Sequence, residues 1–182
     1  MRLIIYTSVI SLLTSIFSIA QNDEPLNLEN ALVVAMQDKT EDRYTLELGI
    51  IELLRKHNIL AKSSLNILKS GQDPTILASD SIKRKLSNEG VNTYMLISVR
   101  GFNKRFNPSK NIPSLKDELR SGHLFPIWRE TASTVTFTII FYRNAVPVHY
   151  ELIRVRAGNS RDKMMKRLIK KMERRITKEW KS

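Results

Sequence analysis

The sequence predicts an α/β protein with a three-layer mixed sheet, in the order β-α-β-α-β, long loop, β-hairpin and C-terminal basic amphipathic helix. Continuous apolar runs over residues 31–36 and 91–99 are typical of strands buried on both faces, as in sheets covered by helices. Segments of helical periodicity separate these runs, which favours right-handed crossovers onto a largely parallel sheet. Alternating residues from 134 onward predict an antiparallel hairpin that widens the same sheet.

Residues 1–20, MRLIIYTSVISLLTSIFSIA, have the features of a secretory signal peptide. Arg2 supplies the positive start, residues 3–17 are apolar, and small residues precede a cleavage site predicted after Ala20. The alternative is an uncleaved membrane anchor, but this apolar segment is shorter than the roughly 20 residues needed to span a bilayer. We therefore expect an exported protein of the bacterial periplasm, with secretion as the alternative.

The chain contains no Cys. Disulfides and thiol chemistry are therefore excluded, and the cleavage site lacks the Cys that would carry a lipid anchor. After a flexible lead-in over residues 21–29, the length predicts one α/β domain over residues 30–182.

The net charge of +12 is concentrated near the C-terminus, where residues 154–182 hold 12 Lys and Arg against 3 Asp and Glu. A local charge on an exported chain disfavours nucleic acid as a partner. It favours an acidic envelope protein, anionic lipid or an anionic polysaccharide.

The first strand is predicted over residues 31–36, followed by a helix over residues 40–57. Thr40 is the expected helix cap, and Asn58 is the expected left-handed residue after its end. An apolar stripe at helical spacing predicts the inner face of this helix: Leu46, Ile50, Leu53, Leu54 and His57.

A short strand is predicted over residues 62–68, then a helix that begins at Asp73 and Pro74 and ends at Gly90. Its inner face is expected to consist of Ile76, Leu77, Ile82 and Leu86. The strand over residues 91–99 completes the β-α-β-α-β unit.

Residues 101–127 are polar and rich in Pro, which predicts a long irregular excursion with one short helix capped by Ser114. Beyond it, the hairpin strands are joined at residues 143–145, and the side of the hairpin that bears the Thr residues is expected to be partly solvated.

The last predicted element is a helix from Ser160 to Trp180, capped by Asn159 or Ser160. The helix has a narrow apolar stripe of Met165, Leu168, Ile169, Met172 and Ile176. Its remaining surface is basic and is the candidate interaction surface: Lys163, Lys166, Arg167, Lys170, Lys171, Arg174, Arg175 and Lys178. A full interfacial membrane helix needs a larger apolar face than this one, so we expect the helix to dock on the sheet with its charges outward.

Four segments carry a resemblance to small bacterial envelope domains: ALVVAMQDKTED, YTLELGIIELLRKHNILAK, EGVNTYMLISVRG and TVTFTIIFYRNAVPVHYELIRV. Their order resembles the anticodon-binding-like α/β domain of the curli secretion lipoprotein family, of penicillin-binding-protein activator lipoproteins and of the amino-terminal domain of TolB. The resemblance implies a non-catalytic interaction domain and transfers no functional residue. The chain departs from the two lipoprotein families by lacking an anchoring Cys, and residues 101–127 do not resemble the pore-forming insertions of the curli family.

No catalytic, metal or cofactor motif is present in the sequence. None of His57, His123 and His149 has metal-ligand spacing. There is no glycine-rich phosphate loop after a strand and no nucleophile elbow. We therefore expect neither a cofactor nor an enzyme.

Ligands of open α/β sheets bind at the carboxyl ends of the strands. Asp38, Thr40 and Arg100 are expected at these ends, with Arg129 as a further candidate, and form a candidate strand-end polar site. Turn and capping roles are the alternative interpretation of Asp38 and Thr40. Convergence of Asp38, Arg100 and His123 on one pocket would favour a third hypothesis, an unrecognised hydrolase.

Overall fold

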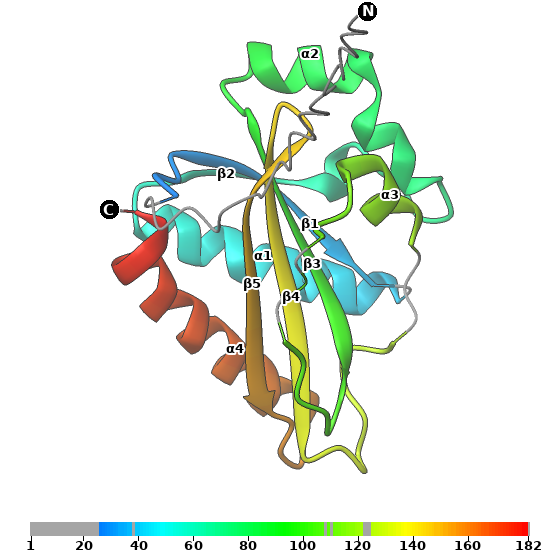
Figure 1. The fold of residues 1–182 in the computed structure, drawn as a ribbon, viewed down its shortest axis with the longest axis vertical. Helices are drawn as coiled ribbons and strands as arrows, with labels where there is room; N and C mark the ends of the chain where they lie inside the picture. Colours follow the sequence, from blue (N-terminus) through cyan, green and yellow to red (C-terminus); the bar gives the residue numbers. More distant parts are fainter. Residues whose placement is uncertain (1–25, 38, 108, 110, 122–124, 182) are drawn as a thin grey trace, which may run out of the picture.

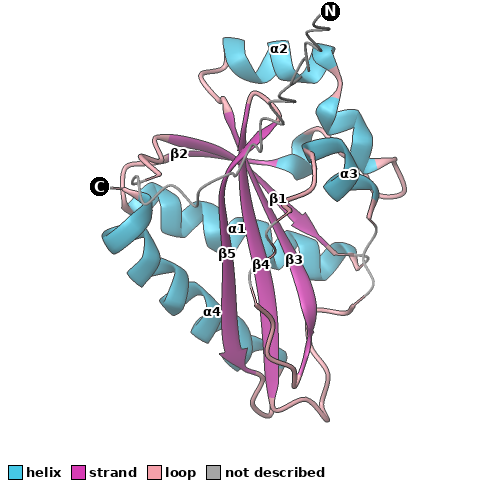
Figure 2. Cartoon of the chain, viewed as in Figure 1, coloured by secondary structure: helices cyan, strands magenta, loops and turns pink. Residues whose placement is uncertain are grey.

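The computed structural model describes residues 26–37, 39–107, 109, 111–121 and 125–181. The predicted signal peptide lies outside these residues. The fold is built on one sheet of five strands in the order β2-β1-β3-β4-β5 (Figure 2). The strands are β1 (Asn30–Met36), β2 (Leu60–Ser63), β3 (Thr93–Phe102), β4 (Thr134–Arg143) and β5 (Val146–Arg156). β1 is parallel to β2 and β3, whereas β3, β4 and β5 are antiparallel, so the predicted mixed sheet is confirmed.

Helices cover both faces of the sheet, which confirms the three layers (Figure 1). The helices α1 (Thr40–Lys56) and α4 (Arg161–Arg175) share one face. The other face carries a 3-10 helix (Pro74–Ala78) and the short helices α2 (Asp80–Asn88) and α3 (Leu115–Arg120). Every residue of β1 is buried, as its continuous apolar run predicts.

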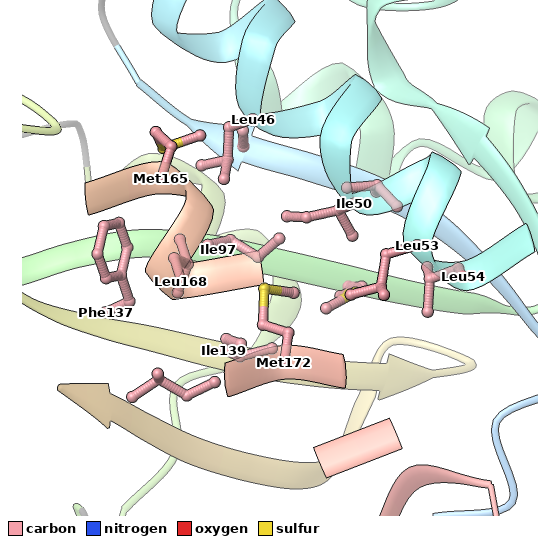
Figure 3. Packing of buried hydrophobic residues seen from close by; sticks show 14 of the residues in the cluster. Leu46, Ile50, Leu53, Leu54, Ile97, Phe137, Ile139, Met165, Leu168 and Met172 are labelled. Atoms are coloured by element: carbon pink, nitrogen blue, oxygen red, sulfur yellow. The ribbon is translucent and has the colours of Figure 1, made fainter. Parts of the chain in front are cut away.

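The larger part of the core lies between the sheet and the pair α1 and α4. Figure 3 shows Leu46 and Ile50 of α1 facing Leu168 and Met172 of α4 above the strand residue Ile139. The predicted apolar stripe of α4 is therefore inside the protein, and Met164 and Trp180 are buried with it. Because this stripe packs in the core, the remaining surface of the helix faces solvent.

The Thr-bearing side of the hairpin is partly solvated along β5, where Arg154 is half-buried and Arg156 is exposed, but it is buried along the middle of β4. Thr136 and Thr138 are 3% and 5% exposed. β4 lies between β3 and β5, and the Thr136 hydroxyl donates to the carbonyl of Lys104 at 3.4 Å, in the segment after β3. The hairpin itself is confirmed: Asn144 and Ala145 both have positive φ, as a tight two-residue turn requires.

Several helix ends differ from the expectation. Thr40 does not cap α1, because Lys39 occupies the cap position and Thr40 is the first helical residue. Asn58 has the predicted positive φ, and Asp73 caps the 3-10 helix at Pro74 as predicted. The helix does not continue unbroken to Gly90, because Ser79 is extended and caps α2 as a new helix.

Two further details near these elements differ. β2 ends at Ser63 and a 3-10 turn follows, so the strand is shorter and earlier than residues 62–68. Ile76 is 41% exposed and does not belong to the core, whereas Leu77 and Leu86 are buried as expected.

The remaining caps agree with the sequence. Ser114 caps α3 and Ser160 caps α4, each through its side chain. Beyond α4 the chain forms a π-helical turn (Ile176–Trp180) in which the N–H of Lys181 donates to the carbonyl of Ile176 at 3.1 Å. This wider turn ends with the Trp180 side chain in the core.

Candidate functional site

Most of the charge on α4 points into solvent and has no acidic partner in the described part of the chain. We call Lys163, Lys166, Arg167, Lys170, Lys171, Arg174 and Lys178 the basic face of α4; all seven residues are exposed. None of them takes part in an ion pair among the described residues, although Asp162 and Glu173 share the helix surface. The helix thus presents a surface of predominantly one sign.

Arg175 does not belong to this surface, although the sequence places it in the same pattern. Its guanidinium Nε lies 2.5 Å from Glu151 Oε1, and its Nη1 pairs with Glu179. Glu151 also accepts a hydrogen bond at 3.1 Å from the indole N–H of Trp180. Burial raises the pKa of the Glu151 carboxyl, and the nearby Arg175 opposes that shift. Arg175 therefore anchors the end of α4 to β5.

Two members of the basic face also hold the free edge of the sheet. Lys171 Nζ donates to the carbonyl of Arg154 at 2.5 Å, and Arg167 Nη1 donates to the carbonyl of Arg156 at 3.2 Å. β5 is an edge strand, and unpaired carbonyls of an edge invite pairing with another chain. These side chains occupy two carbonyls of that edge and bring two helix cations beside Arg154 and Arg156.

The predicted strand-end polar site is not assembled among the described residues. Asp38 lies outside them. Thr40 Oγ1 lies 3.3 Å from Ser70 Oγ, whereas Arg100 lies beside Glu118 of α3. Burial raises the pKa of Glu118, while Arg100 and the Ser98 hydroxyl act in the opposite direction. Arg129 stacks on the Phe102 ring, 4.8 Å from its centroid.

The histidines do not form a site in the described residues. His57 is the residue after α1, where a His is favoured by the helix dipole. His149 is half-buried and its ring centroid lies 5.7 Å from that of Phe141. His123 lies outside the described residues. Within the described chain no group of three His, Asp or Glu side chains is arranged to hold a metal ion.

A buried polar cluster that sequence reasoning missed lies where β1 and β2 end. Glu47 is fully buried and accepts hydrogen bonds from the backbone N–H of Ala35 at 3.0 Å and from Arg43 Nε at 3.1 Å. The hydroxyls of Ser63 and Ser64 donate to its two oxygens at 2.5 and 2.6 Å. All of its acceptor capacity is directed to the protein, so this cluster stabilises the fold and leaves no atom for a ligand.

A depression of about 600 Å³ lies where β5 leads into α4, and the sequence analysis did not find it either. Its lining combines Arg156 and Gly158 with Arg167 of the basic face and with Ser133 and Thr134. None of the described residues between 101 and 127 lines this depression or the smaller hollow of about 220 Å³ beside Asn30. The only available signal was the density of Arg near residue 156, because the lining comes from three separated segments.

Comparison with known proteins does not place the chain in a family. No protein-family model matches it, and no curated protein is significantly similar in sequence. Among solved structures it is similar to the crystal structure of lipoprotein GNA1162 from Neisseria meningitidis, with 10% sequence identity and a TM-score of 0.42. The similarity covers 82% of this chain and 97% of that one. A likeness of this size carries no argument about function. Within the described residues, no helix combines the length and apolar character needed to cross a membrane.

Proposed function

We propose that this chain is an exported, non-catalytic accessory module of a bacterial cell envelope that binds an acidic protein partner through the basic face of α4. The observation that carries the proposal is the set of seven exposed cations without acidic partners among the described residues. Long-range attraction from such a surface speeds encounter and orients an acidic partner. The resemblance to envelope interaction domains supports the same class of function.

The packing of α4 supports a contact made through charge. The apolar stripe of the helix is committed to the core: Leu168, Met172 and Ile176 are each 0% exposed. A helix that lies in a membrane interface needs a free apolar face. Contact with this helix is therefore electrostatic, reversible and sensitive to salt.

Anionic lipid or polysaccharide is the second candidate partner. It is favoured by the depression beside the basic face, where Arg156 and Arg167 lie together at the end of β5. Each Lys or Arg near an anionic leaflet contributes about 1 kcal/mol of attraction. Neither candidate involves nucleic acid or a lipid anchor.

The non-catalytic part of the proposal rests on the sequence, which contains no catalytic motif. The hydrolase alternative requires Asp38 and His123 near Arg100, and the first two lie outside the described residues. The depression near α4 is lined by other residues. Turnover of a panel of ester and glycoside substrates by the purified chain would contradict the proposal.

A pull-down from envelope extracts tests the proposal by comparing the wild-type chain with two variants, each of which lacks three positive charges at a different place. One variant changes three cations of the basic face to Gln: Lys163, Lys166 and Lys170. The control variant removes the same charge from exposed positions before and within α2: Lys69, Arg84 and Lys85.

We expect a defined acidic protein to be recovered with the wild-type chain and with the control variant, and to be lost with the basic-face variant or at high salt. Recovery that is the same for all three proteins would overturn the proposed contact surface. Co-sedimentation of the same three proteins with vesicles that contain anionic lipid decides the second candidate. Binding that ignores the basic-face substitutions would contradict a role for this surface in lipid binding.

A further inference from the structure

The depression at the start of α4 combines cationic side chains with groups already occupied by the protein. Asn103 Oδ1 accepts from the backbone N–H groups of Ser133 and Thr134, at 2.8 and 3.1 Å, and from the Ser133 hydroxyl. The floor therefore has few free donors. Donors for an entering group come from the arginines among the lining residues, Arg156 and Arg167.

Gly158 leaves room for the Arg167 guanidinium beside this depression. A Cβ at residue 158 would lie 2.5 Å from Arg167 Nη1, and φ at this position is +68°. Glycine accommodates this backbone conformation and this close approach without strain. Arg167 also donates to the carbonyl of Arg156 at 3.2 Å, so one of its N–H groups fixes its position and the others remain available.

Two further cations, Arg154 and Lys171, lie next to residues that line the depression. Arg154 Nη2 donates to Thr134 Oγ1 at 3.2 Å, which leaves the Thr134 hydroxyl proton available to another acceptor. The Lys171 ammonium group donates a hydrogen bond to the carbonyl of Arg154. Among the described residues, no carboxylate pairs with Arg154, Arg156, Arg167 or Lys171.

We propose that this depression binds a phosphate group through the guanidinium group of Arg167, with Arg156 and the Thr134 hydroxyl as further donors. Guanidinium groups match the oxygens of phosphate with paired N–H donors. A phosphate monoester carries close to two negative charges at neutral pH and has three terminal oxygens, so it suits a site with two arginines better than a carboxylate does. The phosphate belongs either to a lipid headgroup or to a small soluble phosphate ester.

This inference rests on the proposed function, because Arg167 belongs to the basic face, and it names the chemistry recognised at one end of that surface. A phosphate site at defined residues differs from general electrostatic attraction to the whole basic face. The lysines of the middle of α4 carry the same charge, but they do not line the depression.

The test uses two double variants of equal charge on the full chain. One changes Arg156 and Arg167 to Gln, and the control changes Lys163 and Lys170 to Gln. Binding of glycerol 3-phosphate is measured by isothermal titration, and binding of vesicles that contain phosphatidic acid is measured by co-sedimentation. Circular dichroism and thermal unfolding establish that each variant is folded.

We expect the arginine variant to lose at least about tenfold in affinity for the probe that binds, because two charge-assisted contacts are removed. The lysine control should lose less than about threefold. A variant with both arginines changed to Lys retains the charge without the paired donors, and its affinity should fall between the two. It also serves if the Gln variant does not fold.

Binding of vesicles alone assigns the phosphate to a lipid headgroup, and binding of both probes includes soluble esters. Equal losses in the arginine and lysine variants would overturn the phosphate site while leaving the basic face as a contact surface. Failure of both probes to bind the wild-type chain would also overturn it. The proposed function is judged separately, by the protein recovered from envelope extracts.

Discussion

The helices α1 and α4 lie side by side on the same face of the sheet and use charge in opposite ways. α1 directs three charged side chains inward, and Asp42, Arg43 and Glu47 are each at most 8% exposed. α4 directs only apolar side chains inward over most of its length and exposes its cations. The buried charges of α1 therefore stabilise the fold, whereas the exposed cations of the basic face of α4 remain available to a partner.

The difference follows from what each helix contacts. α1 packs beside the ends of β1 and β2, where backbone N–H groups and Ser hydroxyls face Glu47. Those donors satisfy a carboxylate that would otherwise be costly to bury. α4 packs its stripe on apolar strand residues and pairs with buried carboxylates at its two ends, where Arg161 meets Asp42 and Arg175 meets Glu151.

Substitution of Glu47 by Gln should produce the largest effect, a loss of about 3–5 kcal/mol in the free energy of unfolding. Arg43 would lose its partner, and the new amide N–H₂ would face the Ser63 hydroxyl or other donors. Urea unfolding measures the loss. Glu52 is the matched control on the same helix: its side chain is 73% exposed, and Glu52→Gln should cost less than about 1 kcal/mol. Similar losses of stability in the two variants would contradict the inference that the buried Glu47 stabilises the fold more than the exposed Glu52 does.

Leu168→Ala tests whether apolar packing, rather than charge, holds α4. Leu168 is fully buried between the sheet and α1, so the substitution should destabilise the protein by about 3 kcal/mol. Lys170→Ala removes an exposed charge two residues away and should change stability by less than about 0.5 kcal/mol. Thermal unfolding compares the two. A costly Lys170→Ala would show that the basic face contributes to folding.

Arg161→Gln acts on the ion pair that joins the two helices. Arg161 Nη1 lies 2.5 Å from Asp42 Oδ1, and the Asp42 side chain is only 7% exposed. Loss of the partner leaves this carboxylate poorly solvated, with an expected cost of about 1–2 kcal/mol. Asp162→Asn affects the same arginine through an exposed acid 3.7 Å from its Nε, and unfolding in urea should detect little change. A larger loss of stability for Asp162→Asn than for Arg161→Gln would show that Asp162, and not Asp42, is the important partner of Arg161.

The smallest expected effect is a pH dependence at the C-terminal end of α4. Burial lowers the pKa of His149 below its usual 6.5; Glu179 opposes this shift and Arg175 reinforces it. The unfolded chain therefore takes up the proton more readily. The stability contributed by neutral His149 is present above pH 6.5 and is lost as the pH falls below that value.

We expect the stability of the wild-type chain to decrease relative to His149→Asn between about pH 7.5 and about pH 5. Urea unfolding at each pH gives this difference. Burial raises the pKa of Glu151 nearby, but that carboxyl is present in both proteins and its titration contributes to both curves. A difference that does not change with pH would contradict the assigned shift.

Features that depend on residues close together in the sequence were predicted, and features that depend on residues far apart in the sequence were not. The buried strand β1, the hairpin turn at Asn144 and the cap at Ser160 depend on neighbouring residues, and the sequence predicts each of them. The Glu47 cluster escaped prediction because its partners Ala35 and Ser63 lie 12 and 16 residues away. A period of 3.6 places Glu47 on the inner side of α1 but does not identify a partner.

The candidate site divides in the same way. The sequence predicts the cations of α4, because their spacing around an apolar stripe is a property of one helix. Only the folded chain shows that Arg175 is paired with Glu151 and is not free, and that Arg156 lies beside Arg167 of the basic face. Both facts depend on β5, which packs beside α4. The predicted group of Asp38, Thr40 and Arg100 rested on strand ends alone, and Thr40 and Arg100 have different neighbours in the structure.

Sequence alone determined the class of fold, the order of its elements and the presence of one strongly basic amphipathic helix, since these depend on composition and short-range periodicity. Tertiary structure decided which charges are buried, which are paired and which remain exposed. The reason is physical: the energy of a charge depends on its solvation and on neighbours brought together by packing, and neither is encoded in local spacing.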